Sequence, residues 1–238
     1  MATTPQNPED SGASSPERIL LAAEKLFADK GFGAVSMRKV TTAAGVNLAS
    51  VSYHFGSKDG LIEAVLRRII EPINEERLRL LDLAEGATDA PLEPERILEA
   101  FLRPGIERNQ DTSGERPRLM QLYGRIHAES DSRIHEIFME MFSTISKRFG
   151  AALRRSLPHL TYEEIAWRMH FVIGTMAQTC SEPERVTRLS SGAIQPNAQN
   201  TLAQMIPFLA AGLRCEGIPP TKARTENASS RRKKAGGS

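Results

Sequence analysis

The chain has 238 residues, 40% of them apolar and 25% charged, with a net charge of +2, which is the balance of a globular protein with room for a sizeable core. It contains no apolar run of the roughly 18 residues that a membrane span needs, and its N-terminus lacks the basic start and apolar core of a secretory signal. Cys180 and Cys215 are not spaced like metal ligands or a redox pair. Without an export signal, reduced thiols and a cytoplasmic location are expected. The lack of a long apolar run predicts no membrane partner.

The first residues of the chain predict a tail followed by a helix. Residues 1–14 are rich in Pro, Ser, Thr, Asn and acidic residues without periodicity, which predicts disorder. A first helix is expected to begin near Ser15, which caps it, with a proline in the first turn. It should end at Gly31, after a stripe of apolar residues at helical spacing.

The stretch 36–58 predicts two short helices joined by a tight turn. Ser36 is a good N-cap for a helix over 37–44, and Gly45 can end that helix because it accepts the left-handed conformation. A second helix is expected over 48–55. Its outer side chains are small, polar or aromatic without a carboxylate, as a helix that enters a major groove requires. A plain helical hairpin within a bundle is the alternative on this pattern alone.

Two kinds of DNA contact are expected from these helices. Side chains that can reach phosphates, and so position the protein on a duplex, are Ser36, Arg38, Tyr53, His54 and Lys58. Side chains expected to face the base edges are Asn47, Leu48, Ala49 and Ser50, and Ser52 can also offer them a hydrogen bond.

The remainder of the chain also reads as helix. A fourth helix should begin after Ser57, a natural cap, and pass Pro72, which predicts a kink or a break there. A loop is expected over 85–92, and further helices over 93–108, 116–129, 131–156, 161–181 and 198–215. The stretch 182–196 has no clear assignment, and residues 217–238 predict a disordered basic tail. Almost nothing indicates strand, so the predicted fold class is all-α.

The segments AAEKLFADKGF, AGV, YHFGSK and LIEAVL occur in order within residues 18–66. Together they resemble the DNA-binding domain of the TetR family of bacterial transcription regulators. The resemblance implies an N-terminal three-helix helix-turn-helix domain, residues 15–60, and a larger helical domain for effector binding and dimerisation, residues 61–216. It also implies a homodimer that binds a near-palindromic double-stranded DNA operator, with repression the commoner mode. Ser52 departs from this pattern, since many members carry tyrosine there.

The family's dimer surface is expected on the last two long helices, 161–181 and 198–215. Their apolar stripes would form a four-helix bundle with a second copy. The residues on these stripes are Ile165, Met169, Val172, Ile173, Met176, Leu202, Met205, Ile206, Leu209 and Leu213. The stripes taken by themselves suit an intramolecular core equally well, and the family resemblance favours the dimer.

An effector pocket needs an apolar lining with a few polar tips. Candidates of that kind are Met120, Tyr123, His127, Phe138, Met141, Phe142, Trp167, His170 and Phe171. A histidine among apolar residues more often has a structural role than contacts a ligand. A stripe of methionines more often packs in the core than lines a ligand pocket. The segments at 167–174 and 206–214 resemble a TetR subgroup that includes regulators of fatty-acid degradation. That likeness implies a small, largely apolar effector, such as a fatty acid or acyl-CoA.

No catalytic constellation is recognisable in the sequence. It has no glycine-rich phosphate loop, no HExxH and no Cys/His metal spacing, and its five histidines are scattered. No enzyme activity, cofactor or metal is therefore expected. The alternative is an all-α small-molecule-binding protein or enzyme without DNA binding, which would show no salt-sensitive DNA retention.

Overall fold

The computed structural model describes residues 15–110, 122, 126, 132–182 and 184–217, and every regular element in these ranges is helical. This confirms the predicted all-α class. None of the described helices is long and apolar enough to cross a membrane. The helices in chain order are α1 (Ser15–Lys30), α2 (Met37–Ala44), α3 (Leu48–Phe55), α4 (Lys58–Gly86), α5 (Pro94–Gln110), α7 (Ser132–Met141), α8 (Ser143–Ser156), α9 (Tyr162–Ser181), α10 (Arg185–Leu189) and α11 (Ala198–Arg214).

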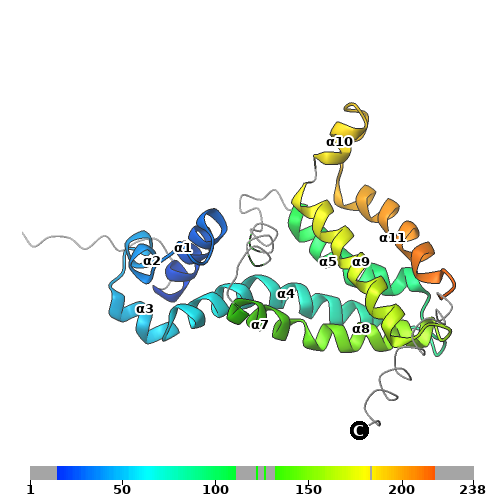
Figure 1. The fold of residues 1–238 in the computed structure, drawn as a ribbon, viewed down its shortest axis with the longest axis horizontal. Coiled ribbons are helices and arrows are strands. Elements are labelled where there is room, and N and C mark those ends of the chain that lie inside the picture. Colours follow the sequence, from blue (N-terminus) through cyan, green and yellow to red (C-terminus); the bar gives the residue numbers. More distant parts are fainter. Residues whose placement is uncertain (1–14, 111–121, 123–125, 127–131, 183, 218–238) are drawn as a thin grey trace, which may run out of the picture.

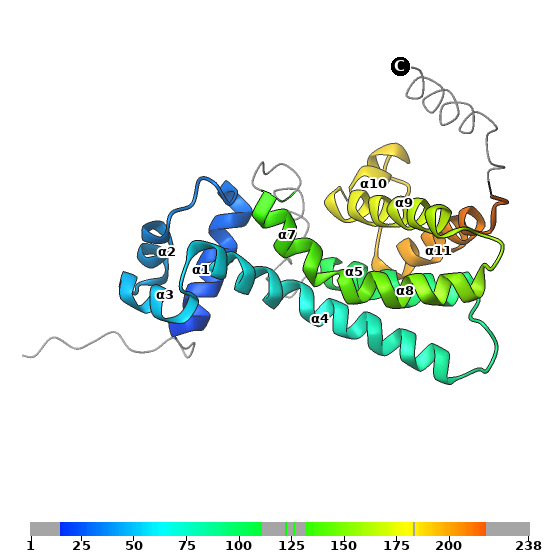
Figure 2. The same ribbon diagram turned by 60° about the horizontal axis from the view of Figure 1, so that its bottom comes forward.

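The helices form a small head and a larger body (Figure 1). The head consists of α1, α2 and α3 at one end of the molecule, and the body begins with α4, which leaves the head and runs along α7 and α8 (Figure 2). Within the body, α5 packs against both α4 and α11, while α9 contacts α8, α5 and α11. A single cluster of buried apolar side chains extends through head and body, so the two share one core.

Side-chain caps set the bounds of the two short helices. The Ser36 hydroxyl accepts a hydrogen bond from the Lys39 backbone N–H at 3.4 Å and begins α2. Gly45 ends α2 in the left-handed region, with φ of 64°, and Asn47 caps α3 through its side-chain oxygen. The helices expected over 37–44 and 48–55 are therefore confirmed with their predicted bounds.

A kink or a break was expected at Pro72; helix α4 runs unbroken for 29 residues, so the break does not occur. Proline has no N–H to donate and costs the helix one backbone hydrogen bond. The Pro72 ring is exposed, while the neighbouring Ile69, Ile70 and Ile73 are buried in the core. Tertiary packing of this apolar stripe holds the helix through the proline. The predicted division of the chain at residue 60 falls within the first turn of α4.

Other expectations in the body need correction or lie beyond the described residues. The single helix expected over 131–156 is divided, because Phe142 adopts φ −98° and ψ −1° and its N–H bonds to the Met139 carbonyl at 3.2 Å. The unassigned stretch 182–196 contains the short helix α10. The helix expected over 116–129 and the tails expected to be disordered, 1–14 and 217–238, lie outside the described residues except for isolated positions.

Candidate nucleic-acid interface

The turn between α2 and α3 is held by a side chain from α1. The Arg18 Nη2 donates to the carbonyl oxygen of Ala44 at 2.8 Å and to that of Gly45 at 3.1 Å. A Cβ added at Gly45 would lie 3.1 Å from the same nitrogen. Glycine thus meets two requirements here, the positive φ and the close approach of Arg18. The glycine turn and the Arg18 hydrogen bonds together fix the orientation of α3 relative to α1.

Helix α3 is anchored on one side and open on the other. Val51 is fully buried and Phe55 half-buried against the core. The Asn47 Oδ1 accepts a hydrogen bond from the Ser50 backbone N–H at 2.8 Å. Because neither α2 nor α3 contains an acidic residue, the open side of α3 presents no charge that would repel a phosphate backbone.

The residues predicted to contact DNA are all exposed or half-buried in the structure. Tyr53 is 85% exposed, and its ring lies edge-on to that of His54 with 5.1 Å between the centroids. Leu48 is 45% exposed at the first position of α3. The exposed members of the set are Ser36, Arg38, Asn47, Leu48, Ala49, Ser52, Tyr53 and His54, and the half-buried ones are Ser50 and Lys58.

The helix starts in this region add positive partial charge. Ser57 begins α4 by accepting a hydrogen bond from the Gly60 N–H at 3.1 Å, which places Lys58 in the first turn. Unpaired backbone N–H groups at such a start favour an anion. The sequence reasoning missed Gly60, at which an added Cβ would overlap the Phe55 carbonyl oxygen. The tight turn between α3 and α4 therefore requires glycine, for which the sequence pattern gave no signal.

The residues predicted for the dimer surface lie mostly in the core of the protomer. Those buried within it are Ile165, Val172, Met176, Leu202, Met205, Leu209 and Leu213, whereas Met169, Ile173 and Ile206 are half-buried. The buried seven contribute to the core of the protomer, so the side chains that α9 and α11 offer to a second copy are the exposed and half-buried ones. These stripes pack α9 and α11 against α5 and α8, which is the intramolecular alternative that the sequence left open.

The residues predicted for the effector pocket are not brought together. Phe138 is buried, and Met141 and Phe142 are half-buried around the junction of α7 and α8. Trp167 and Phe171 lie instead on the outside of α9, where they are 58% and 59% exposed. His170 is also exposed on α9. The other three candidates, Met120, Tyr123 and His127, lie outside the described residues.

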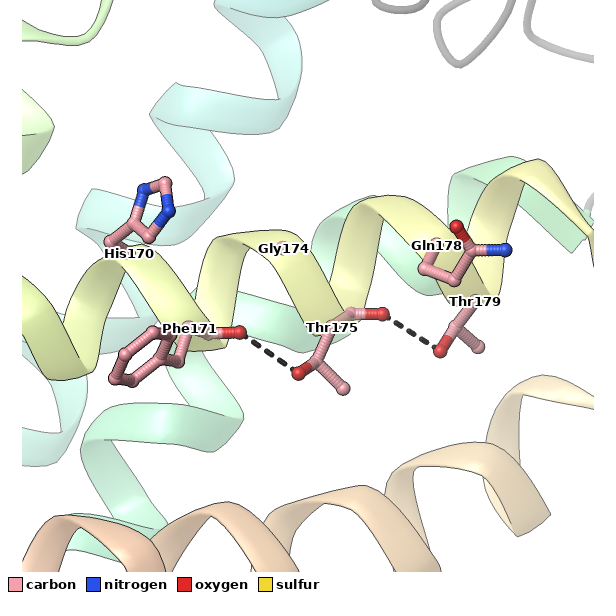
Figure 3. Close-up of a pocket in the computed structure, with 6 residues that line it drawn as sticks. All are labelled: His170, Phe171, Gly174, Thr175, Gln178 and Thr179. Carbon is pink, nitrogen blue, oxygen red and sulfur yellow. Dashed lines mark hydrogen bonds between the residues drawn. The ribbon is translucent and has the colours of Figure 1, made fainter.

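The outer side of α9 carries a shallow hollow of about 460 Å³ (Figure 3). Residues of α9 form its lining: His170, Phe171, Gly174, Thr175, Gln178 and Thr179. The Thr175 and Thr179 hydroxyls donate to backbone carbonyls one turn earlier on the same helix, each at 2.8 Å. A small-molecule site needs walls from more than one side, so this hollow has the form of a helix face rather than of a pocket.

Comparison with known proteins gives two family matches. Residues 19–65 match the model described as bacterial regulatory proteins, TetR family. Residues 99–212 match the tetracyclin repressor-like C-terminal domain. The two matched ranges contain α2 and α3 of the head and most of the body, so both parts of the molecule point to one family.

Individual relatives agree with these matches. The transcriptional repressor KstR2 of Mycolicibacterium smegmatis is 33% identical over 81 residues, which is 34% of this chain and 38% of the relative. The match thus spans less than half of that relative's length. The structure of the ketosteroid regulator KstR2 of Mycobacterium tuberculosis has a TM-score of 0.56 at 18% identity, covering 85% of this chain and 96% of that one.

A further solved structure, a SmeT–triclosan complex, has a TM-score of 0.58 at 20% identity and covers 88% of this chain and 98% of that one. At these identities the likeness between structures establishes the fold. The family assignment rests on the two family models, and the relatives found are regulators rather than enzymes. The chain belongs to the TetR family of bacterial regulatory proteins.

Proposed function

We propose that this protein is a dimeric transcriptional repressor that binds a near-palindromic DNA operator and leaves it when a small, largely apolar effector binds. The observation that carries the proposal is the capped, outward-facing helix α3, which is free of acidic residues and sits in a head of the TetR type. A relative that matches over 81 residues is itself named a transcriptional repressor. A cytoplasmic location fits this function.

In the proposed complex α3 enters the major groove. The start of the helix, Asn47 to Ser50, faces the base edges, and Ser52 adds a hydroxyl beside them. The side chains that contact phosphates are Ser36, Arg38, Tyr53, His54 and Lys58. All of these residues are exposed or half-buried, which supports both assignments. Each head reads one half-site, and the two half-sites lie about 34–36 Å apart, or a multiple of that distance.

The dimer surface is proposed on the outward faces of α9 and α11. Trp167 and Phe171 are stacked, with ring centroids 6.0 Å apart, and Phe208 of α11 is 74% exposed. The exposed Gly174 and Gly212 would permit close approach of a second pair of helices. An aromatic surface of this kind indicates a protein interface more often than a solvated face. Two helices from each copy would make the four-helix contact.

The effector is proposed to bind inside the body, next to α4. Phe138 and Phe142 lie there with ring centroids 4.9 Å apart, and Met141 packs against the same core. The SmeT structure, which contains triclosan, supports a small apolar ligand in this fold. Ligand binding would favour a dimer whose heads are wrongly spaced for the operator. DNA and ligand must then weaken each other by the same factor, with a coupling of about 1–3 kcal/mol.

The first experiment is selection of DNA bound by the full-length protein from a random pool, with the recovered complex sized in solution. A palindromic consensus held by two copies is the expected result. The alternative is an all-α small-molecule-binding protein or enzyme without DNA binding. No enrichment above background at low salt would favour that alternative and overturn the proposal, because phosphate contacts are strongest when salt is low.

A further inference from the structure

A charged side chain, Arg77 of α4, lies deep in the core of the body with only 2% of its surface exposed. It falls on the buried stripe of α4, between Ile73 and Leu81, where the helix otherwise turns apolar side chains inward. Burial lowers the pKa of Arg77 to about 10, which still leaves the guanidinium charged near neutral pH. A buried charge is costly unless it is paired and fully hydrogen-bonded.

The described partners of Arg77 satisfy two of its three nitrogens well. Nε donates to the Phe101 carbonyl oxygen at 2.8 Å, and Nη1 donates to the Asn74 Oδ1 at 3.0 Å. Among the described residues, the third nitrogen, Nη2, reaches only the Met176 Sδ, at 3.6 Å, and a thioether is a weak acceptor. Within the part of the chain that the structure describes, no carboxylate pairs with Arg77.

The described side chains around the guanidinium are apolar and carry no opposite charge. Its central carbon lies 4.4 Å from the centroid of the Phe101 ring and 6.0 Å from that of Phe142. Cys180 is also nearby, but burial raises the pKa of its thiol to about 11 despite the opposing effect of the Arg77 charge, so the thiol is neutral at pH 7. Aromatic faces stabilise a cation partly, and they leave its positive field available to an anion.

A glycine on α5 lets the backbone of that helix pack close to Nη2. A Cβ added at Gly105 would lie 3.4 Å from the Arg77 Nη2 and 3.5 Å from the Met176 Sδ. These are ordinary van der Waals contact distances, so the Nη2 edge, which has the weakest partner, is covered by α5 and by the Met176 thioether. Met176 is itself flexible and adapts its shape at low cost, so its thioether is the contact most easily replaced.

We propose that the Nη2 edge of Arg77 anchors the effector, and that the effector is a small molecule with a carboxylate head and an otherwise apolar body. A carboxylate accepts two hydrogen bonds from a guanidinium in a fixed plane and supplies the missing charge. It would take the place of the Met176 thioether, while Phe101 and Asn74 keep Arg77 oriented. This inference rests on the proposed function, because it assigns the head-group position of the same effector.

The position of Arg77 connects such a ligand to the head. Arg77 belongs to α4, the helix that begins at the DNA-binding end. Its partner Asn74 also donates through Nδ2 to the Met141 carbonyl at 3.0 Å, which links α4 to the end of α7. A carboxylate bound at Nη2 thus acts on the helix that carries the head and on the junction that packs against it.

The test is calorimetric titration of the full-length protein with hexanoate, decanoate and tetradecanoate, each compared with the primary alcohol of the same length. At least one acid is expected to bind tenfold or more tightly than its alcohol. Arg77→Gln is expected to abolish that preference. Arg79→Gln is the matched control, because Arg79 lies on the same helix, is exposed and pairs only with Glu76 among the described residues; it should retain the preference.

Arg77 is buried, so the loss of binding in Arg77→Gln needs a control for misfolding. Two further variants that retain the Arg77 charge provide it. Gly105→Ala narrows the Nη2 edge and is expected to reduce the preference for acid over alcohol at least threefold. Met176→Leu removes only the competing thioether and is expected to maintain or strengthen acid binding. The inference would be overturned if acids and alcohols bound equally well. It would also be overturned if the two single variants, Gly105→Ala and Arg77→Gln, both left the preference for acid over alcohol unchanged.

The two proposals fail in different ways. If the protein selects a palindromic DNA but none of the acids binds better than its alcohol, the Arg77 site is wrong and the repressor function stands. If no DNA is enriched but acids bind through Arg77, the repressor function is wrong and the anion site stands.

Discussion

The Arg68 guanidinium of α4 lies 2.6 Å from the Glu17 carboxylate and 3.9 Å from that of Glu24, both on α1. This cluster joins the first helix of the head to the helix that enters the body. The side chains of Arg68 and Glu17 are 31% and 46% exposed, so water and salt screen their attraction. We therefore expect the cluster to orient the head rather than to add much to the free energy of unfolding.

Arg68→Gln is expected to lower the free energy of unfolding by less than about 1 kcal/mol and to weaken binding to the selected DNA by up to about fivefold. Fluorescence anisotropy and chemical denaturation would measure the two effects. Arg67→Gln is the control, since Arg67 pairs with Glu63 and Glu71 of its own helix. Equal effects of the two substitutions on DNA affinity would contradict the orienting role of Arg68.

Lys58→Ala is expected to weaken all DNA sequences about equally, because a phosphate contact carries no base information. The slope of log affinity against log salt should fall by about 0.9, the value for one lost contact. Titrations at several salt concentrations would measure it. Lys147→Ala, an exposed lysine of α8 in the body, should leave the slope unchanged. A changed sequence preference with an unchanged slope would assign Lys58 to the bases instead.

Gly45→Ala is expected to destabilise the protein by about 1–2 kcal/mol, because an L-residue is strained at positive φ and the new Cβ would crowd Arg18. Gly150→Ala is the contrasting variant. Gly150 lies inside α8 and an added Cβ there meets nothing within 4 Å. That substitution should stabilise by about 0.5–1 kcal/mol. Urea denaturation of both variants checks the sign, and destabilisation by both would refute this account.

Phe208→Glu is expected to weaken the dimer by roughly 2 kcal/mol or more, since it removes an aromatic contact and places a charge in the proposed interface. Sedimentation equilibrium would show more monomer, with the helical content retained. Leu83→Glu alters another exposed apolar residue, on α4 and 64% exposed, and should leave the dimer intact. A dimer unaffected by Phe208→Glu, or equally weakened by both, would move the interface elsewhere.

The head could be predicted closely from the sequence, because its bounds depend on local chemistry. Ser36, Gly45 and Asn47 are caps whose side chains or backbone geometry act within a few residues. Such signals need no knowledge of the distant chain. The division between α7 and α8 at Phe142 had no such signal, since Phe142 makes no side-chain cap and breaks the helix only by its backbone conformation.

Which face of a body helix is buried could not be read from apolar spacing. Helix α9 has apolar residues on both sides, with Val172 in the core and Trp167 in solvent. The richest stripe was assigned to the dimer, and the structure places that stripe inside. The buried Arg77 was missed although its spacing from Ile70, Ile73 and Leu81 puts it on the apolar stripe of α4. A charge on such a stripe was the available sign of an interior polar site.

Because α4 is uninterrupted, a small tilt at its body end becomes a large displacement of the head. The two heads of a dimer must therefore be held precisely. The 29 residues of α4 span about 43 Å at 1.5 Å per residue. A tilt of about 5° at the body end therefore displaces the head by about 4 Å, which exceeds the 3.4 Å rise between successive base pairs. A small angular change inside the body would move one head a full step along the duplex. In the proposed complex, a modest repacking around a bound effector would therefore be enough to lose the operator.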